Sequence, residues 1–330
     1  MLYLDLFDFK SSITFFLILL SNLVILHFRD NFAQFLNIFD YPNERKIHSN
    51  PTPLIGGICL FITISISLIL IFFDSLISTN KFTIFILFYL IFFSIGLWDD
   101  AKTLSPKIRT LIVIISIIIL IPFENDFVVK ELIFKSTDRE INLGNFSILF
   151  TIFCIFSLYN ALNFIDGYNG SATSIIIFWT LLLFFKNPSL LYLFIIFSMI
   201  LIFFYNLSGK IFLGNSGTSL LSIFFSLSII NDYNIIKSLY ADEILFLLLF
   251  PGIDMIRVTF ERIMNKKKIY YADNTHFHHY LIKKNINYIW QIILILTVMP
   301  LSLFYILENI NLTITIFILV YFGALIRLRK

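Results

Sequence analysis

The chain of 330 residues is 58% hydrophobic and 14% charged, with a formal net charge of +3 and a mean hydropathy of +0.90. Soluble domains carry about 25% charged residues, so this composition excludes a soluble protein and indicates a polytopic membrane protein. The small net charge does not indicate a nucleic-acid partner. Because lipid offers no partner to backbone N–H and C=O groups, and the apolar runs lack the alternation of barrel strands, we predict an all-α fold.

Eleven apolar runs are predicted to cross the membrane as helices. They are residues 11–28, 54–73, 82–98, 108–123, 146–164, 171–185, 188–205, 218–230, 241–256, 289–307 and 312–326. A crossing needs about 20 residues, so the shorter helices are expected to extend into flanking polar residues. No domain boundary is evident, and residues 1–330 are predicted to form a single transmembrane domain. Residues 124–145 are predicted to form a short external hairpin around Asp138 and Gly144.

Polar stretches occur at every second junction between these runs. They are residues 40–48, 99–100, 160–170, 214–217 and 276–279. Alternate junctions lie on one side of a membrane, so these stretches are expected to converge on one face. Of the 24 Lys and Arg residues, 17 lie on that side and 7 on the other. The positive-inside rule then predicts an inner-membrane protein with these stretches in the cytoplasm, the amino terminus outside and the carboxyl terminus inside.

Asp99 and Asp100 stand at the end of the third run. Adjacent carboxylates at a membrane edge repel each other unless a cation or a donor compensates, which favours a divalent ion. Neighbouring helical residues point about 100° apart, so one carboxylate is expected near a metal and the other near a proton to be removed. A solvated helix end neutralised by Lys102 is an equally good interpretation of the pair alone.

Asn160, Asn163 and Asp166 recur every third residue and are followed by Gly167, Asn169 and Gly170. This spacing predicts one polar face at the end of the fifth helix, before the glycines free the backbone. Buried amides and a carboxylate need partners, and a nucleotide or a metal ion would supply them. Helix-to-helix hydrogen bonding is the alternative, but it explains three aligned groups poorly.

Gly214 and Gly217 flank Asn215 and Ser216 directly before the eighth run. Two glycines around small polar residues allow backbone N–H groups to approach an anion at a helix start. Taken alone, the motif fits an ordinary turn between helices at least as well.

Two further groups of residues carry histidines and basic side chains. His276, His278 and His279 follow three consecutive lysines and lack nearby thiolates, which favours phosphate recognition over a zinc site or incidental surface residues. Arg45, Lys46 and His48 stand between prolines ahead of a pair of glycines, as expected of an ordered basic loop that grips a lipid phosphate or a diphosphate. The positive-inside rule alone would explain the basic residues, although not the prolines and glycines.

Together these motifs resemble the polyprenyl-phosphate N-acetylhexosamine-1-phosphate transferase family (glycosyltransferase family 4), which includes the phospho-MurNAc-pentapeptide transferase. The resemblance runs from Asp40 to His279. It rests on Asp40-x-Pro42-Asn43-x-Arg45-Lys46-x-His48, Asp99-Asp100, Asn160-x-x-Asn163-x-x-Asp166-Gly167-x-Asn169-Gly170, Phe212-x-Gly214-Asn215-x-Gly217 and His276-x-His278-His279. The first and last motifs are similar to the branch that uses UDP-N-acetylglucosamine.

The resemblance implies that a polyprenyl (undecaprenyl) phosphate attacks the β-phosphorus of a UDP-sugar at the cytoplasmic face, giving a polyprenyl-diphospho-sugar and UMP. It implies Mg²⁺ as cofactor, with Mn²⁺ as an alternative ion, and is compatible with a homodimer. The resemblance implies catalytic roles for Asp99, Asp100 and Asp166. It implies that the metal ion is bound by Asp99, Asp100, Asn163 and Asn215. The substrate-binding residues are then Asp166 and Asn169 at the nucleotide, the histidines at the diphosphate or sugar, and Asn160, Arg45, Lys46 and His48. The product would begin a lipid-linked cell-surface glycan, such as an O-antigen, a capsule or a teichoic-type linkage unit.

Asn215 is the one departure from the family pattern, which normally has an aspartate there. An amide carbonyl brings no charge, so the affinity for magnesium is expected to fall unless other groups compensate. This residue supports the alternative that the chain binds a nucleotide-sugar or polyprenyl phosphate without turnover. A transporter is less favoured, because the polar groups gather at one face and few ionisable residues lie within the runs.

Overall fold

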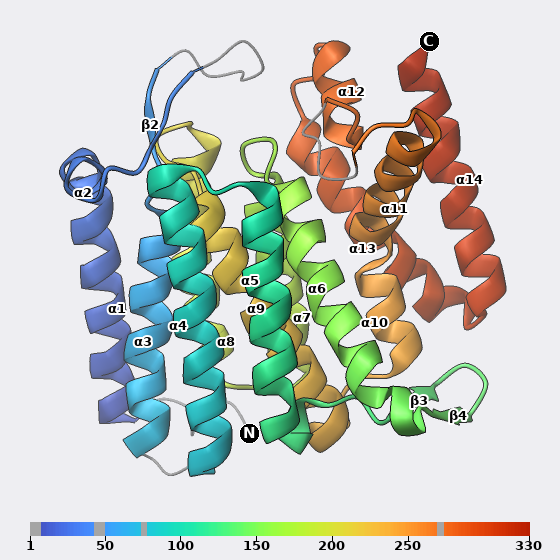
Figure 1. Ribbon diagram of the computed structural model, residues 1–330, viewed down its shortest axis with the longest axis horizontal. Helices are drawn as coiled ribbons and strands as arrows, with labels where there is room; N and C mark the ends of the chain where they lie inside the picture. The colour runs from blue at the N-terminus through green and yellow to red at the C-terminus, as the bar shows by residue number, and fades with distance from the viewer. Residues whose placement is uncertain (1–7, 43–49, 74–77, 269–273) are drawn as a thin grey trace.

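The computed structural model describes residues 8–42, 50–73, 78–268 and 274–330, with the side chains of residues 71–73 left out. Apart from two short hairpins, the described chain is helical (Figure 1). The helices are α1 Phe9–His27, α2 Arg29–Leu36, α3 Gly56–Phe73, α4 Thr79–Lys102, α5 Pro106–Leu120, α6 Ser147–Ile165, α7 Ser171–Lys186, α8 Leu190–Leu207, α9 Gly214–Asn231, α10 Ala241–Leu247, α11 Leu249–Met264, α12 Phe277–Lys283, α13 Ile289–Leu307 and α14 Ile310–Arg329. The paired strands are β1 Phe39–Asp40 with β2 Thr52–Pro53, and β3 Glu131–Phe134 with β4 Arg139–Asn142.

The prediction of an all-α polytopic membrane protein is confirmed. Within the described residues, 8 helices are long and apolar enough to cross a membrane, and two shorter helices, α3 and α7, are also apolar. Every predicted run falls on a helix or, for residues 241–256, on the pair α10 and α11. The helices extend into polar residues as expected, since α4 covers Thr79–Lys102 where the apolar run is 82–98. The count of eleven crossings stays a prediction.

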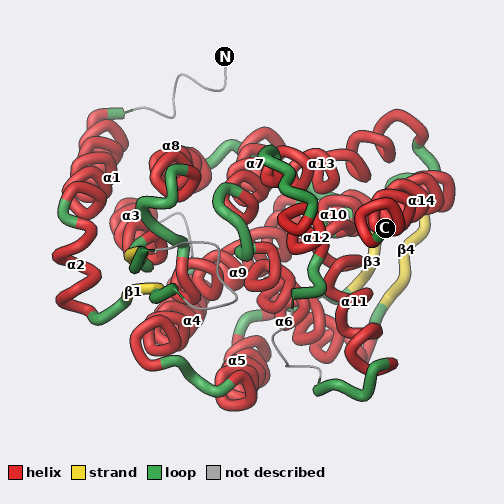
Figure 2. The backbone as a smooth tube through the Cα atoms, turned by 90° about the horizontal axis from the view of Figure 1, so that it is seen from above, coloured by secondary structure: helices red, strands yellow, loops and turns green. Residues whose placement is uncertain are grey.

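Helix α9 forms the centre of the bundle (Figure 2). From Gly214 to Ile230 every residue of α9 except Asn215 is buried. Glycines bring two neighbours to backbone contact with it. A Cβ on Gly96 of α4 would lie 2.4 Å from the carbonyl oxygen of Asn215, and a Cβ on Gly57 of α3 would lie 2.4 Å from the nitrogen of Gly217. These two contacts fix the ends of α3 and α4 against the first turn of α9.

The two ends of the helical layer differ. One end carries α2, the β1–β2 hairpin, the last turn of α4 and α12, and we call it the site end. The opposite end carries the β3–β4 hairpin, and we call it the hairpin end (Figure 1). Helix α1 begins at the hairpin end and α14 finishes at the site end (Figure 1). The predicted polar stretches that the structure describes therefore gather at one end of the layer.

The structure departs from the predicted elements in three places. The run 241–256 is broken at Leu248, ahead of Pro251, because a proline ring clashes with the carbonyl group four residues before it. Helix α11 then continues to Met264, well beyond the apolar run. The short helix α2 was not predicted. The hairpin within residues 124–145 was predicted correctly, and Asp138 and Gly144 both have positive φ angles, +48° and +50°.

Candidate active site

Asp100 caps the first turn of α9. Its Oδ1 accepts the backbone N–H of Asn215 (2.7 Å), and its Oδ2 accepts the N–H (2.9 Å) and hydroxyl (2.7 Å) of Ser216. The first N–H groups of a helix lack partners within it, and this carboxylate supplies them from another helix. The sequence placed the glycine motif before the helix, but α9 begins at Gly214 itself. The anion at this helix start is thus a side chain of α4.

Asp99 pairs with Arg109, a cation outside the predicted motifs. Its Oδ1 accepts the N–H of Leu104 (2.6 Å), and its Oδ2 accepts Nη1 of Arg109 (2.6 Å). The same Nη1 donates to Oδ1 of Asn215 at 3.3 Å. Arg109 lies in the first turn of α5, one short turn after the aspartate pair, so its closeness in sequence to Asp99 was the available signal. The side chain of Arg109 is only 19% exposed, so it is not simply a surface cation surrounded by water.

Asn163 joins α6 to this cluster. Its Nδ2 donates to Oδ1 of Asn215 at 3.0 Å. Asp99, Arg109, Asn215 and Asn163 therefore form a continuous hydrogen-bonded chain across α4, α5, α9 and α6, which we call the central chain. Asn160, one turn earlier, instead donates to the carbonyl of Phe156 in its own helix at 2.8 Å.

Asp166 ends α6 and lies within the field of other carboxylates. Burial, together with the nearby carboxylates of Asp100 and Asp40, raises its pKa to about 8. At neutral pH this carboxyl group is therefore mostly protonated unless a cation lies beside it. The ends of α4, α6 and β1 thus converge, although they are far apart in the sequence.

The turn after Asp166 is held by neighbouring helices. Gly170, with φ of +83°, donates its N–H to Oδ1 of Asn206 at 2.7 Å. Nδ2 of Asn169 lies near Gly209, in the turn between α8 and α9, where it would be 3.5 Å from a Cβ built on that glycine. The predicted nucleotide residues Asp166 and Asn169 thus flank a fixed turn.

The three histidines occupy different environments around the start of α12. His276 is the N-cap residue, and its Nδ1 lies 2.9 Å from Oδ2 of Asp254. His278 is buried against the α6–α7 turn. Burial and the neighbouring His279 and His276 hold its pKa well below the usual range, so this ring is neutral. The ring of His279 lies beside that of His278, with centroids 4.1 Å apart.

Asp254 is a second site residue that was not predicted from the sequence. It is a carboxylate within the run 241–256, and an ionisable residue in an apolar run is by default a candidate functional residue.

Arg45, Lys46 and His48 lie outside the described residues. The base of their loop is fixed to the site, because Phe212 donates its N–H to the carbonyl of Pro53 (2.9 Å) and Gly57 donates to that of Leu213 (2.9 Å).

The oxygen donors in and beside the central chain suit a hard cation. Among the described residues, no three His, Cys, Asp or Glu side chains stand together at metal-binding distances. The predicted metal ligands, however, are two carboxylates and two amides, and such oxygen donors are the ligands that Mg²⁺ prefers. Asp99, Asp100, Asn163 and Asn215 are linked through the contacts given above, so these are the residues that could hold such an ion.

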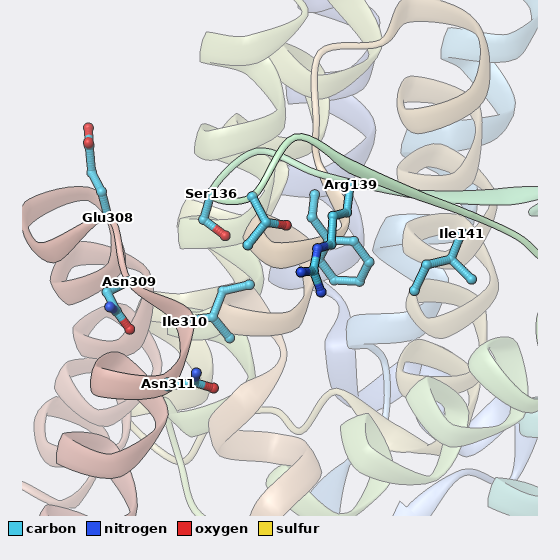
Figure 3. A pocket seen from close by; sticks show the side chains of 9 residues that line it. Ser136, Arg139, Ile141, Glu308, Asn309, Ile310 and Asn311 are labelled. Atoms are coloured by element: carbon cyan, nitrogen blue, oxygen red, sulfur yellow. The ribbon is translucent and has the colours of Figure 1, made fainter.

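A cavity lies away from these residues. It has a volume of ≈ 370 Å³ and lies between the β3–β4 hairpin and the start of α14, with Arg139, Asn309 and Ile310 in its wall (Figure 3). None of the predicted site residues lines it. The site at the opposite end is defined by converging polar side chains rather than by this hollow.

Replacing Gly167 with alanine is expected to displace His278. A Cβ at this position would lie 2.2 Å from Nε2 of the buried imidazole. Overpacking of this kind costs about 1–3 kcal/mol, so the melting temperature of the purified protein is expected to fall. Gly252→Ala is the control, because nothing lies within 4 Å of a Cβ there.

If the collision is the cause, adding His278→Ala to Gly167→Ala should restore part of the lost stability. Equal stability of Gly167→Ala and the wild type would contradict the packing described here.

Fold and site together define a polytopic membrane protein in which carboxylates, amides and histidines from α4, α6, α9 and the start of α12 meet at one end of the helical layer. Residues 82–232 match the family described as Glycosyl transferase family 4. The match covers a little under half of the chain and includes Asp99, Asn163, Asp166 and Asn215.

Three relatives cover most of the chain. The probable undecaprenyl-phosphate N-acetylglucosaminyl 1-phosphate transferase of Bacillus subtilis (strain 168) is 27% identical over 296 residues, which is 86% of this chain and 80% of that protein. Undecaprenyl-phosphate alpha-N-acetylglucosaminyl 1-phosphate transferases of Thermotoga maritima and Escherichia coli (strain K12) are each 26% identical, covering 77% and 81% of this chain and 76% and 75% of their own lengths. The predicted resemblance to the N-acetylglucosamine-1-phosphate transferase branch is thereby confirmed.

Proposed function

We propose that the protein is an enzyme that transfers an N-acetylhexosamine 1-phosphate from a UDP-sugar to undecaprenyl phosphate. An oxygen of the lipid phosphate forms a bond to the β-phosphorus of the UDP-sugar, the bond from that phosphorus to the bridging oxygen breaks, and UMP leaves. The names of the relatives support this reaction. The structural observation that carries it is the central chain, which brings Asp99, Arg109, Asn163 and Asn215 together at the site end.

Phosphoryl transfer depends on positioning and on charge neutralisation more than on covalent participation of the protein. Asp99, Asp100, Asn163 and Asn215 would hold Mg²⁺ or Mn²⁺, which supplies positive charge to the diphosphate. Arg109 adds a fixed cation between Asp99 and Asn215. Asp99 is the better candidate to orient or deprotonate the lipid phosphate, because it accepts only one backbone N–H and the Arg109 side chain, whereas Asp100 accepts three hydrogen bonds from α9.

The remaining predicted residues are proposed to bind the donor and the lipid. Asp166 and Asn169 flank the turn that would receive the nucleotide, with Asn160 one helical turn before Asn163. His278 lies against this turn, with the rings of His276 and His279 beside it, and the three histidines would contact or frame the diphosphate or sugar. We propose that a phosphate group is bound by Arg45, Lys46 and His48.

The site end is proposed to face the cytoplasm of the cell, with the amino terminus outside. The 17-to-7 distribution of Lys and Arg supports this orientation. Reporter tags after Asn80, Lys102 and Lys330 test it, because the first should lie outside and the other two inside.

The decisive assay uses the purified protein with undecaprenyl phosphate, Mg²⁺ and a panel of UDP-sugars, scored for UMP. Release of UMP with at least one N-acetylhexosamine donor is expected. Binding of donor or lipid without UMP from any sugar would instead support the non-catalytic alternative, which the relatives do not favour.

Replacing Asn215 with aspartate is expected to lower the magnesium concentration that gives half-maximal UMP release by about tenfold or more, since a charged ligand binds a hard cation more strongly. The new carboxylate would also lie 3.3 Å from Arg109 and 3.0 Å from Nδ2 of Asn163, two donors that favour its charged form. Magnesium titrations of both proteins at saturating substrates measure this effect.

Asn231→Asp, at the other end of α9, is the matched control and should leave the magnesium dependence unchanged. An unchanged dependence in Asn215→Asp itself would show that position 215 is not a ligand.

A further inference from the structure

Asp254 of α11 is a buried carboxylate to which the proposed reaction assigns no role. Asp254 is only 8% exposed. Oδ1 accepts Nη2 of Arg257 and the hydroxyl of Tyr321, both at 2.7 Å, and Oδ2 lies 2.9 Å from Nδ1 of His276. The N–H of Phe277 lies 3.2 Å from Oδ1. Donors from α11, from α14 and from the start of α12 therefore meet on this one side chain.

Arg257 makes the arrangement rigid. Its Nε donates to the hydroxyl of Tyr321 (2.7 Å), and its Nη2 donates to the carbonyl of Thr275 (2.7 Å), the residue before His276. The guanidinium group thus holds both the carboxylate and the backbone that carries the histidine. A charged pair buried in this way is costly unless its remaining donors and acceptors are satisfied, and here they are.

This geometry determines which nitrogen of His276 carries a proton. An ionised carboxylate only accepts hydrogen bonds, so Nδ1 must donate to Asp254, and the opposite nitrogen, Nε2, is left for another partner. The side chain is 6% exposed, yet no hydrogen bond to Nε2 occurs among the residues that the structure describes. The imidazole lies against Phe164 of α6, with ring centroids 4.7 Å apart, and Phe164 directly follows Asn163 of the central chain in the sequence.

His278 differs from His276 in this respect. Its Nε2 is also without a partner within the described chain, but it faces Gly167 at a distance that leaves no room for a Cβ. A ring packed on backbone in this way frames the turn, whereas His276 has one nitrogen fixed and the other unused.

We infer that Asp254 is a positioning residue, which keeps a proton on Nδ1 of His276 and holds the ring so that Nε2 contacts the diphosphate or sugar of the donor. Arg257 and Tyr321 keep the carboxylate in place. The inference rests on the proposed function only for the identity of the group that Nε2 contacts.

The first test is nitrogen NMR of protein with ¹⁵N-labelled histidine. The signal of His276 is assigned by its loss in His276→Gln, and in the wild type Nδ1 is expected to be protonated. Asp254→Asn is expected to abolish this preference. An unprotonated Nδ1 in the wild type overturns the inference. The measurement needs neither turnover nor a folded Asp254 variant, so it is independent of the proposed function.

The second test is a double-mutant cycle on UMP release. Asp254→Asn and His276→Gln are each expected to lower kcat about 10- to 100-fold, the range known for outer partners of functional histidines in metal sites. Because Asp254 acts through His276, the double variant should be no slower than His276→Gln alone. Multiplied losses in the double variant overturn the inference, because they would show that Asp254 acts independently of the imidazole.

The control is Asp232→Asn. Asp232 is a fully buried carboxylate at the hairpin end, and it accepts the hydroxyl of Tyr192 (2.9 Å) and Nδ2 of Asn187 (3.0 Å). This variant should lower the melting temperature while leaving kcat per folded molecule unchanged. A matching loss of kcat in Asp232→Asn would show that the effect of Asp254→Asn reflects lost stability, and would overturn the inference.

Discussion

UMP release by an Asp99→Asn variant is expected to fall about 10²- to 10⁴-fold, the usual contribution of a group that moves or orients a proton in the transition state. The substitution keeps an oxygen that can accept the N–H of Leu104 but removes the charge facing Arg109. The guanidinium, 19% exposed, then loses its anionic partner beside Asn215. Steady-state kinetics with saturating undecaprenyl phosphate measure the effect, and binding of the UDP-sugar should change only slightly.

Asp99 is a better target than Asp100 for this experiment. An asparagine at position 100 would turn an amide against the N–H groups of Asn215 and Ser216, so it would damage the cap of α9 as well as any chemistry. Asp126→Asn is the control, because Asp126 also pairs with a cation, Lys81 at 2.9 Å, but at the hairpin end. Turnover of Asp99→Asn within about tenfold of the wild type would remove this residue from the mechanism.

Replacing Gly96 with alanine is expected to impair both stability and activity. The added Cβ would lie 2.4 Å from the carbonyl oxygen and 2.5 Å from the Cα of two successive residues of α9, Asn215 and Ser216. Both obstacles are backbone atoms, so α4 must move away from α9. We expect a loss of about 1–3 kcal/mol in the free energy of unfolding, measured by thermal or denaturant unfolding in detergent.

The same displacement moves Asp99 and Asp100, which lie one helical turn after Gly96. A shift of about 1 Å in a positioned group can cost 10²-fold in rate, so kcat should fall along with stability. Gly323→Ala is the matched control in another long apolar helix, since nothing lies within 4 Å of a Cβ there. Its effect should be neutral or favourable by up to about 1 kcal/mol. A Gly96→Ala protein as stable and active as that control would contradict the close packing of α4 on α9.

Most of the helices could be predicted from the sequence because the signal for them is local. A long apolar run in this composition must satisfy its backbone groups internally, and that requirement does not depend on its neighbours. The ends were harder to predict, because they depend on partners. Helix α9 begins at Gly214 rather than Thr218, and its first N–H groups are satisfied by the carboxylate of Asp100, 115 positions before Asn215 in the sequence. The break at Leu248 had a local signal in Pro251, which the long apolar run concealed.

By itself, the sequence determined that this protein is a helical membrane protein whose polar motifs meet at one end, because alternation of crossings is a matter of counting apolar runs. Only the tertiary structure decided which polar groups pair: Asp100 with the start of α9, Asp99 with Arg109, and Asp254 with His276. These pairs depend on how each helix is rotated about its axis and on how closely glycines let backbones approach. Rotation and approach are properties of packed neighbours, and no single segment of the sequence contains them.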